Sequence, residues 1–343
     1  MPNAYISGTG YYVPPRRVTN DELVTEYRID TSNEWIVQRT GIEERRFADA
    51  GVSCSDLALK ASEMAIRNAG IDKKAIEMII FATLSPDQHF PGSGCFLQEK
   101  LGLCDGDSAT FVPALDIRNQ CSGFLYGLAT ADSMIKSGAV KHVLLVGAEV
   151  HSAAIDLTTR GRNVSTLFGD GAGVVVVSAT DADRGVRRWN LGADGRNADK
   201  LHMRIWDISK RPYIPLDESG NGCMLPEMMY PNMNGKAVFK HAVERMISVL
   251  LKTLGDVNQS LNDVDLFLFH QANLRINQFI QQQLGVPEEK FFHNIQRYGN
   301  TTAGTIPILL AEAEENGRLK PGMKVAIVVF GSGFTWGCAL IDW

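Results

Sequence analysis

The sequence predicts an α/β fold built from two similar halves. Two observations lead to this expectation. Amphipathic helices alternate with short apolar strands along the chain, as they do in the α/β class. The same order of elements also occurs twice, at an offset of about 180 residues, which is too long for a solenoid repeat. Two copies of one α/β unit, packed on each other, account for both observations.

The first copy follows from its helix and strand signals in order. A serine precedes its first amphipathic helix and a glycine ends it, which are common start and stop residues. The expected elements are a helix over 53–70, a strand over 76–83, a helix ending at 97–103, a strand over 111–117, a helix after Cys121, a strand within 138–149 and a turn and strand over 168–179.

The second copy repeats this order after a boundary at 179–185. Its expected elements are a helix over 236–255, a strand over 264–271, a helix ending at 280–286, the segment KFFHNI at 290–295, a helix after Asn300, a strand within 317–331 and a closing strand over 330–343. We therefore expect an N-terminal half over residues 1–179 and a C-terminal half over 180–343.

Composition excludes several classes of protein. The chain of 343 residues is 45% hydrophobic and 21% charged, as in soluble globular proteins, and its net charge of -5 gives no reason to expect nucleic acid. No run of about 18 apolar residues predicts a membrane span, and the N-terminus does not resemble a signal peptide. Six scattered cysteines without metal-type spacing are typical of reduced thiols, so we expect a cytoplasmic protein.

Cys121 lies where an apolar strand ends and an apolar helix begins, in LDIRNQCSGFLYGLATADSMIKSG. The amino-terminal end of a helix has unpaired N–H groups and a partial positive charge. A thiol placed there is expected to ionise more easily and to be a better nucleophile. The alternative is a small buried thiol without chemistry, which is the commoner situation for a free cysteine.

Asn300 lies at a helix start in the second half that is equivalent to the helix start at Cys121. His270 follows a strand whose counterpart in the first half ends at Ala82 and Thr83. His270 follows four apolar residues, and the ends of strands border the crevice where α/β proteins bind ligands. Alone, His270 could be a core-edge histidine and Asn300 a helix cap. Because corresponding ends of two packed copies face a shared centre, we expect Cys121, His270 and Asn300 to converge.

The glycine-rich stretches predict different structures. ISGTGYYVPP lacks the third glycine of a dinucleotide fingerprint and GDGAG lacks a phosphate-loop lysine, so both predict tight turns. FGSGFTWG, at 330–337, contains small residues that let backbone N–H groups approach a reacting oxygen, as an oxyanion hole requires.

With these residues in place, the chain closely resembles β-ketoacyl-ACP synthase III, a condensing-enzyme family of the thiolase superfamily. The resemblance extends nearly end to end and rests on DTSNEWIVQRTGIEERR (30–46), the junction at Cys121, FGDGAG, HQANLRI, GNTTAG and FGSGFTWG. It implies a duplicated, layered αβαβα thiolase fold, a homodimer, and acyl transfer in fatty acid or related acyl-chain synthesis.

The resemblance implies the roles of four catalytic positions. Cys121 resembles the nucleophile that takes an acyl group from acyl-CoA as a thioester. His270 and Asn300 resemble the pair that binds the thioester oxygen of malonyl-ACP while carbon dioxide leaves. The backbone N–H groups of Cys121 and Ser332 would hold the tetrahedral oxyanion. Such a reaction needs no metal if preorganised donors hold the developing charge; the resemblance implies no tightly bound cofactor, with the coenzyme A thioester as substrate.

The resemblance also implies residues for coenzyme A. Trp35 is similar to the aromatic side chain that stacks on the adenine, and Arg39 belongs to the same motif. Arg160 resembles the arginine on the other face of that base, although Arg162 could substitute because the surrounding segment is about two residues longer than the family pattern. Asn273 would touch the pantetheine arm.

Three further residues receive roles from the resemblance alone. Arg275 would belong to the basic patch that receives the acidic carrier protein. Phe90 resembles the residue that crosses the dimer interface to form the floor of the partner's acyl pocket. Phe330 would lie beside the nucleophile.

The chain departs from the family pattern in three places. Ser332 replaces the usual glycine, which leaves its backbone N–H available. The methionine-rich segment 197–234 is longer than in acetyl-using members; it is either a surface loop or part of a reshaped acyl pocket. Gly92 and Gly94 could leave extra room. We therefore hypothesise an acyl-CoA primer longer than acetyl.

Other functions share the same residue set. A superfamily acyltransferase could join two acyl-CoAs or acylate another nucleophile with the same Cys, His and Asn. A cysteine hydrolase also uses these residue types, but the duplication and HQANLRI argue against it. A non-catalytic partner subunit is disfavoured because all three reactive positions are present.

Overall fold

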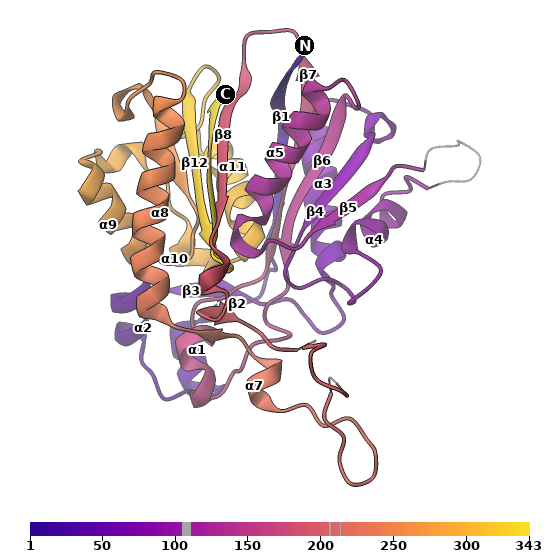
Figure 1. The fold of residues 1–343 in the computed structure, drawn as a ribbon, viewed down its shortest axis with the longest axis vertical. Coiled ribbons are helices and arrows are strands. Elements are labelled where there is room, and N and C mark those ends of the chain that lie inside the picture. The colour runs from indigo at the N-terminus through magenta and orange to yellow at the C-terminus, as the bar shows by residue number, and fades with distance from the viewer. Residues whose placement is uncertain (105–110, 206, 213) are drawn as a thin grey trace.

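The structure, a computed structural model, describes residues 1–104, 111–205, 207–212 and 214–343. Two mixed sheets form its body, with strand orders β1-β7-β6-β4-β5 and β11-β12-β13-β8 (Figure 1). The strands of the first sheet are β1 (Asn3–Tyr12), β4 (Met78–Ala82), β5 (Ala114–Ile117), β6 (His142–Glu149) and β7 (Gly171–Thr180). Those of the second are β8 (Gly185–Ala193), β11 (Leu266–Phe269), β12 (Lys324–Gly331) and β13 (Thr335–Asp342).

The two sheets share one pattern of strand directions. In the first, β4 runs parallel to β6, and β6, β7 and β1 then alternate in direction. In the second, β11 runs parallel to β12, and β12, β13 and β8 alternate in the same way. The counterpart of β5 differs, because the segment 290–295 makes only an isolated bridge between Phe267 and Phe291. The ring of Phe291 also stacks on that of Phe267.

Helices and sheets form five layers. The central layer holds α5 (Gly123–Lys136) and α11 (Thr305–Glu315), whose apolar side chains share one core with both sheets (Figure 1). The outer layers hold α3 (Cys54–Ala69) and α4 (Ser93–Lys100) on the first sheet, and α8 (Gly235–Gly255) and α9 (Leu274–Leu284) on the second. The predicted duplicated αβαβα fold is confirmed. The boundary between an N-terminal half over 1–179 and a C-terminal half over 180–343 stays a prediction.

Local sequence signals explain where the outer helices begin and end. Ser53 and Asp56 form a capping box at the start of α3, so two otherwise unpaired N–H groups are satisfied. Gly70 ends the helix in the left-handed conformation, which costs glycine little. At α9, the Asn273 side chain accepts from the Arg275 amide, and Gly285 ends the helix in the left-handed conformation. For α3, the expected start and stop residues are the observed ones.

The remaining helices and strands are short. They are β2 (Arg17–Thr19), α1 (Asn20–Thr25), α2 (Asn33–Thr40), β3 (Glu44–Arg46), α6 (Arg162–Ser165), β9 (Leu201–His202), α7 (Pro226–Met229), β10 (Asn232–Met233) and α10 (Ile295–Tyr298). Between β9 and α7 the chain extends away from the body, at the bottom of Figure 1. Within the described ranges, no helix is long and apolar enough to cross a membrane.

Glycines let the central layer pack directly on the first sheet. A Cβ atom on Gly147, in β6, would overlap the carbonyl oxygen of Ala303. A Cβ atom on Gly173, in β7, would overlap the backbone of Pro307 and Ile308 at the start of α11. Backbone atoms cannot move aside as a flexible side chain can, so both positions require glycine.

We expect Gly147→Ala to lower the free energy of unfolding by about 3 kcal/mol, the upper end of ordinary overpacking costs. Gly255→Ala is the matched control, because nothing lies within 4 Å of a Cβ built at that helix end. It should be neutral or slightly stabilising, since alanine favours helix. Chemical denaturation of the three proteins checks this; equal stability of Gly147→Ala and wild type would contradict the packing argument.

Candidate active site

Cys121 lies in a tight 3-10 turn, η2 (Gln120–Ser122), that leads directly into α5. Gln120 adopts a φ of 46°, a left-handed conformation uncommon for a residue other than glycine, and so turns the chain sharply before the thiol. The side chain of Cys121 is buried. Gly331, at the end of β12, touches it so closely that a Cβ atom there would come within 2.9 Å of the Cys121 Cβ.

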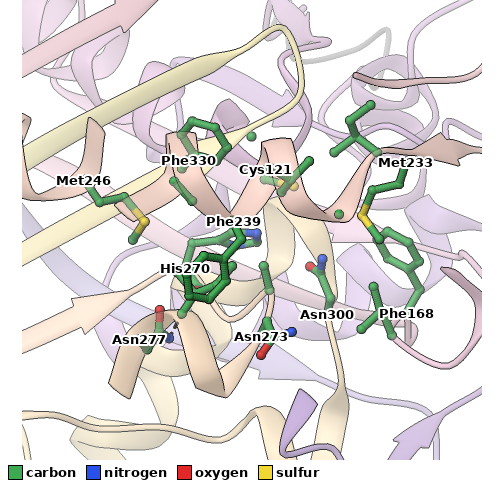
Figure 2. Close-up of a pocket in the computed structure, with 18 residues that line it drawn as sticks. Cys121, Phe168, Met233, Phe239, Met246, His270, Asn273, Asn277, Asn300 and Phe330 are labelled. Atoms are coloured by element: carbon green, nitrogen blue, oxygen red, sulfur yellow. Dashed lines mark hydrogen bonds between the residues drawn. The ribbon is translucent and has the colours of Figure 1, made fainter. Parts of the chain in front are cut away.

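One cavity brings together the three residues that the sequence predicts to converge. Cys121, His270 and Asn300 all line it, although they come from both halves of the chain (Figure 2). The other lining residues are mostly apolar and come largely from α8, α9 and the ends of β9, β10 and β12: Leu201, Met233, Val238, Phe239, Ala242, Met246, Ile276 and Phe330. The site is therefore an apolar cavity with a few polar groups, the usual form of a small-molecule site.

His270 follows the last residue of β11, and its amide donates to the carbonyl of Val328 in β12. Its Nδ1 lies 2.6 Å from Thr305 Oγ1, while its buried Nε2 has no hydrogen-bond partner among the described residues. The Thr305 hydroxyl can turn toward Thr302 O or toward Nδ1. When it donates to Nδ1, the ring proton of a neutral His270 is on Nε2, where it can donate to a ligand.

Asn300 is fixed by backbone contacts on both sides. Its amide donates to Leu167 O at 2.8 Å, and its carbonyl accepts from the amide of Gly169. The Thr302 amide donates to Asn300 Oδ1 at 2.8 Å. The side-chain NH₂ of Asn300 is therefore the group that can donate to a ligand in the cavity.

The ionisation of Cys121 differs from the sequence-based expectation. Burial raises the pKa of the Cys121 thiol to about 12, and the nearby charge of Glu149 adds to this. Hydrogen bonds from its own backbone N–H, from the Thr302 side chain and from the Ser332 backbone act in the opposite direction. The prediction that the helix start makes this thiol ionise more easily is wrong for the empty site, because desolvation outweighs the donors.

Ser332 contributes through its backbone. Its N–H group hydrogen-bonds the Cys121 sulfur, and its hydroxyl donates to Leu201 O at 2.5 Å, away from that sulfur. Two backbone N–H groups, those of Cys121 and Ser332, therefore meet at the nucleophile. An oxyanion formed there would find both within reach.

Glu149, at the end of β6, is a buried carboxylate beside the nucleophile. Burial raises its pKa to about 7, although hydroxyl and amide groups of Ser85, Leu84 and Ala303 donate to it. Because these donors come from the loop after β4 and from the turn before α11, Glu149 links the two segments. Glu149 is therefore a structural anchor whose charge reaches the thiol.

The arginines predicted for the nucleotide are arranged differently from the expectation. Arg39 lies over the ring of Trp35, with its Cζ 4.3 Å from the ring centroid. Arg162 lies near the same ring at 5.5 Å. Arg160 instead pairs with Asp156 and lies over another aromatic ring, that of Tyr230. The structure thus brings the alternative, Arg162, to Trp35 in place of Arg160.

Asn273 and Arg275 join α9 to α2. Asn273 lines the cavity, and its Nδ2 donates to the carbonyl of Arg39 at 3.1 Å. The Arg275 guanidinium donates to the carbonyls of Val37 and Gln38, near the carboxyl end of α2. Arg275 therefore has a structural contact that the sequence did not indicate, and its contact with a carrier protein remains a prediction.

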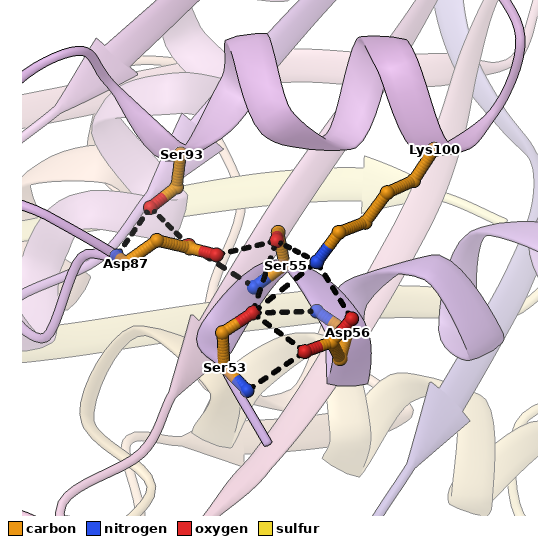
Figure 3. A network of polar contacts seen from close by, with 6 residues as sticks. All are labelled: Ser53, Ser55, Asp56, Asp87, Ser93 and Lys100. Atoms are coloured by element: carbon orange, nitrogen blue, oxygen red, sulfur yellow. Dashed lines mark hydrogen bonds and ion pairs between the residues drawn. The ribbon is translucent and has the colours of Figure 1, made fainter. Parts of the chain in front are cut away.

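Phe90 lies outside the cavity of its own chain. It is 79% exposed, in the loop between β4 and α4. A polar network holds that loop: Asp87 accepts hydrogen bonds from Ser55 and Ser93, and Lys100 bonds Ser55 from α4 (Figure 3). Phe330, by contrast, lines the cavity as expected.

The space at Gly92 and Gly94 is taken by a carboxylate. Asp116 accepts hydrogen bonds from the amides of Ser93 and Gly94, and a Cβ atom on either glycine would collide with its side chain or come within 3 Å of it. These glycines therefore admit Asp116 to the start of α4. The expectation that they leave extra room for an acyl chain is not supported by this packing.

Among its described residues, the segment 197–234 contributes to the cavity near its two ends. Leu201 and Met233, in the paired strands β9 and β10, line the cavity. Between them, Ile208 and Leu216 are exposed. Both sequence interpretations hold in part, because the ends of the segment shape the cavity and its described middle lies at the surface.

Sequence reasoning missed Thr302, Thr305, Glu149 and His151. Thr302 and Thr305 lie within two to five residues of Asn300 and contact Cys121 and His270. Glu149 and His151 stand at the end of β6. A polar residue directly after an apolar strand was the signal used for His270, and it could have indicated these two as well.

Comparison with known proteins gives one consistent family. Residues 115–195 match the family "3-Oxoacyl-[acyl-carrier-protein (ACP)] synthase III", and residues 238–343 match its C-terminal part. Proteins named β-ketoacyl-[acyl-carrier-protein] synthase III from Clostridium perfringens and Geobacillus kaustophilus are 40% and 41% identical, each over 99% of both chains. A crystal structure of 3-oxoacyl-[acyl-carrier-protein] synthase III from Aquifex aeolicus has a TM-score of 0.86 at 38% identity, covering 99% of this chain and 100% of that one.

Proposed function

Because this chain belongs to the β-ketoacyl-ACP synthase III family, we propose that it condenses an acyl-CoA primer with malonyl-ACP, with loss of carbon dioxide, to give a 3-oxoacyl-ACP. The protein is an acyltransferase of the 3-oxoacyl-ACP synthase III type. The observation that carries the mechanism is the meeting of Cys121, His270 and Asn300 in one apolar cavity.

The first half-reaction moves the acyl group to Cys121. Cys121 gives up its thiol proton to solvent as its sulfur attacks the acyl-CoA carbonyl carbon, and the backbone N–H groups of Cys121 and Ser332 stabilise the tetrahedral oxyanion. Coenzyme A then leaves as its thiolate and takes a proton from solvent. Donors fixed at the position of developing charge favour the transition state over the ground state.

The second half-reaction uses the other side of the cavity. His270 Nε2–H and the Asn300 NH₂ group donate to the thioester oxygen of malonyl-ACP. As the carbon–carbon bond to the carboxylate breaks, its electron pair forms an enolate whose charge rests on that oxygen. The enolate carbon attacks the acyl-Cys121 carbonyl, and the Cys121 thiolate leaves.

We propose a homodimer formed through the edge of the first sheet. β5 ends the strand order of that sheet, and the nearby side chains of Phe90, Phe111 and Leu115 are 79%, 70% and 40% exposed. An open strand edge flanked by large exposed apolar side chains is a surface that a second copy can cover. Phe90 would then reach the acyl pocket of the partner.

The preferred primer is proposed to be longer than acetyl. The apolar lining that surrounds the cavity, including Met233 and Met246, supports this, since methionine side chains adapt to flexible chains. The test is mass spectrometry of the Cys121 peptide after incubation with acetyl-, branched-chain and medium-chain acyl-CoAs. We expect an acyl adduct on Cys121 that forms fastest with a primer longer than acetyl. Clear preference for acetyl-CoA would reject the longer primer, and no adduct from any acyl-CoA would reject the proposed function.

Product analysis separates the proposed function from its alternative. Acylated enzyme mixed with malonyl-ACP should give a 3-oxoacyl-ACP and carbon dioxide. An enzyme that joins two acyl-CoAs would give a condensed product without malonyl-ACP. The same assay with malonyl-CoA tests whether the donor must be on the carrier protein, for which Arg275 is proposed as a contact.

Coenzyme A is proposed to bind as a substrate at Trp35, with Arg39, Arg162 and Asn273. We expect Arg162→Ala to raise KM for acyl-CoA roughly two- to fivefold with little change in kcat, the size of one lost cation–π contact. Arg160→Ala is the matched control and should change KM less, because Arg160 lies over Tyr230 and not over Trp35. Steady-state kinetics with acyl-CoA measure both KM values. A larger rise in KM for Arg160→Ala than for Arg162→Ala would return the adenine contact to Arg160.

A cytoplasmic location is also proposed. All six cysteines are free thiols in the structure, which supports a reducing compartment.

A further inference from the structure

Thr302 connects all three reactive groups of the cavity. Its hydroxyl lowers the pKa of the Cys121 thiol by hydrogen bonding, its amide donates to Asn300 Oδ1, and its carbonyl lies 3.0 Å from the Thr305 hydroxyl that contacts His270 Nδ1. Thr302 adopts a φ of 48°, in the left-handed region that β-branched residues rarely enter. The chain therefore holds Thr302 in an unfavourable conformation at the point where its three polar groups serve three partners.

His151 is the second partner of the Thr302 hydroxyl. Its Nε2 lies 2.6 Å from Thr302 Oγ1. The ring is buried and packs against Phe168, with centroids 4.7 Å apart, and the His151 amide holds the buried carboxylate of Asp170. Nothing in the proposed reaction uses this buried histidine.

The tautomer of His151 sets the direction of these hydrogen bonds. Burial lowers its pKa to about 3, so the imidazole is neutral at working pH and carries one ring proton. With that proton on Nε2, His151 donates to Thr302 Oγ1. The hydroxyl hydrogen of Thr302 is then free to point at the Cys121 sulfur.

We propose that His151 and Thr302 form a chain of hydrogen-bond donors, His151 Nε2–H to Thr302 Oγ1–H to Cys121 sulfur, that stabilises the Cys121 thiolate. Thr302 is a catalytic residue in this proposal, since it touches the reacting sulfur, and His151 is a positioning residue. The inference rests on the proposed function, in which the thiolate is the nucleophile of the first half-reaction and the leaving group of the second. The chain donates hydrogen bonds and transfers no proton.

The surroundings of the sulfur explain why such donors are needed. The Glu149 carboxylate opposes ionisation of Cys121, and Asp170 lies on the far side of His151. His270, the other titratable side chain lining the cavity with Cys121, has its pKa lowered to about 3 by burial and supplies no positive charge. None of these three groups is a cation, so uncharged hydrogen-bond donors must stabilise the thiolate.

The test measures the rate at which iodoacetamide alkylates Cys121, followed on its own peptide, from about pH 6 to about pH 9. Thr302→Val removes the hydroxyl and keeps the β-branch, and Thr302→Ser restores the hydroxyl. His151→Leu removes the donor, and His151→Gln restores one. Exposed Cys95 is an internal reference in the same sample.

Thr302→Val should raise the pKa of Cys121 by about one to two units, because a hydrogen bond to a charged group is lost. Alkylation should slow only about three- to tenfold at each pH, since a more basic thiolate is more nucleophilic. His151→Leu, which acts through Thr302, should slow it about two- to threefold. Both conservative variants should recover the wild-type rate, and Cys95 should not change.

Unchanged Cys121 alkylation in Thr302→Val would overturn the proposal. An effect of Thr302→Val without one of His151→Leu would overturn the part assigned to His151. If His151→Gln failed to restore the rate lost in His151→Leu, packing and not hydrogen bonding would be the role of the ring. Should Thr302→Val not fold, Thr302→Ala carries the same expectation. Alkylation needs no acyl-CoA, so this test and that of the proposed function fail separately.

Discussion

Cys121→Ala is expected to abolish formation of the acyl-enzyme and to lower the condensation rate by roughly 10⁴-fold or more, as loss of a covalent nucleophile does. The reason is that Cys121 is the thiol that lines the cavity together with His270 and Asn300. The measurement is release of coenzyme A from acyl-CoA, together with the mass of the intact protein.

Cys95→Ala is the matched control, because Cys95 is an exposed thiol that does not line this cavity. It should retain the wild-type rate and the wild-type adduct. An acyl adduct that persists at full rate in folded Cys121→Ala would assign the nucleophile to another residue. Thermal unfolding of each variant shows whether the lost activity is chemical or structural.

His270→Ala is expected to separate the two half-reactions. Decarboxylation of malonyl-ACP should fall about 10²- to 10³-fold, the cost of removing one donor from a developing oxyanion. Acylation of Cys121 should continue, because the proposed donors for that step are the backbone N–H groups of Cys121 and Ser332. Equal losses in both half-reactions would contradict this division of roles. His293→Ala is the control, since His293 is a histidine that does not line this cavity.

The pH dependence gives a second check on His270. Burial lowers its pKa to about 3, so the neutral ring persists as the pH falls from 7 toward 4. A histidine with an ordinary pKa would become charged near pH 6.5. The decarboxylation rate of the wild-type enzyme should therefore not fall near pH 6.5 unless that of His270→Ala falls there too. A fall near pH 6.5 in the wild type alone would show that a solvated histidine acts at this step.

Local patterns were sufficient to predict an α/β fold of two similar halves, whereas the layered αβαβα arrangement came from the family resemblance. Periodic apolar residues, with Ser53 and Gly70 at the ends, determine α3 from its own sequence. The repeated order of elements then indicated the two packed copies. The segment 290–295 stands where the repeated order places a strand in the first half, yet it forms one isolated bridge, between Phe267 and Phe291. Strand formation depends on a neighbour that the sequence does not identify.

The site was predictable where chain position alone determines it. Cys121, His270 and Asn300 stand at matched element ends, and such ends meet when two copies pack. Whether Arg160 or Arg162 lies near Trp35 depends on the turn of the chain at α6 and on the pairing of Arg160 with Asp156. Sequence order reveals neither of these. The pKa of Cys121 was predicted in the wrong direction because the helix start is a local effect, whereas burial depends on the whole fold.

The shared cavity has a consequence for the order of events in each turnover. Cys121 lies in the same cavity as His270 and Asn300, so the two thioesters must reach adjacent positions in one cavity. Coenzyme A has to depart before the second thioester can enter, which is a ping-pong order. Acyl-CoA in excess would then inhibit binding of malonyl-ACP, and malonyl-ACP in excess would inhibit binding of acyl-CoA. The two substrates would compete for one cavity, although only the acyl group of the first reacts with the second.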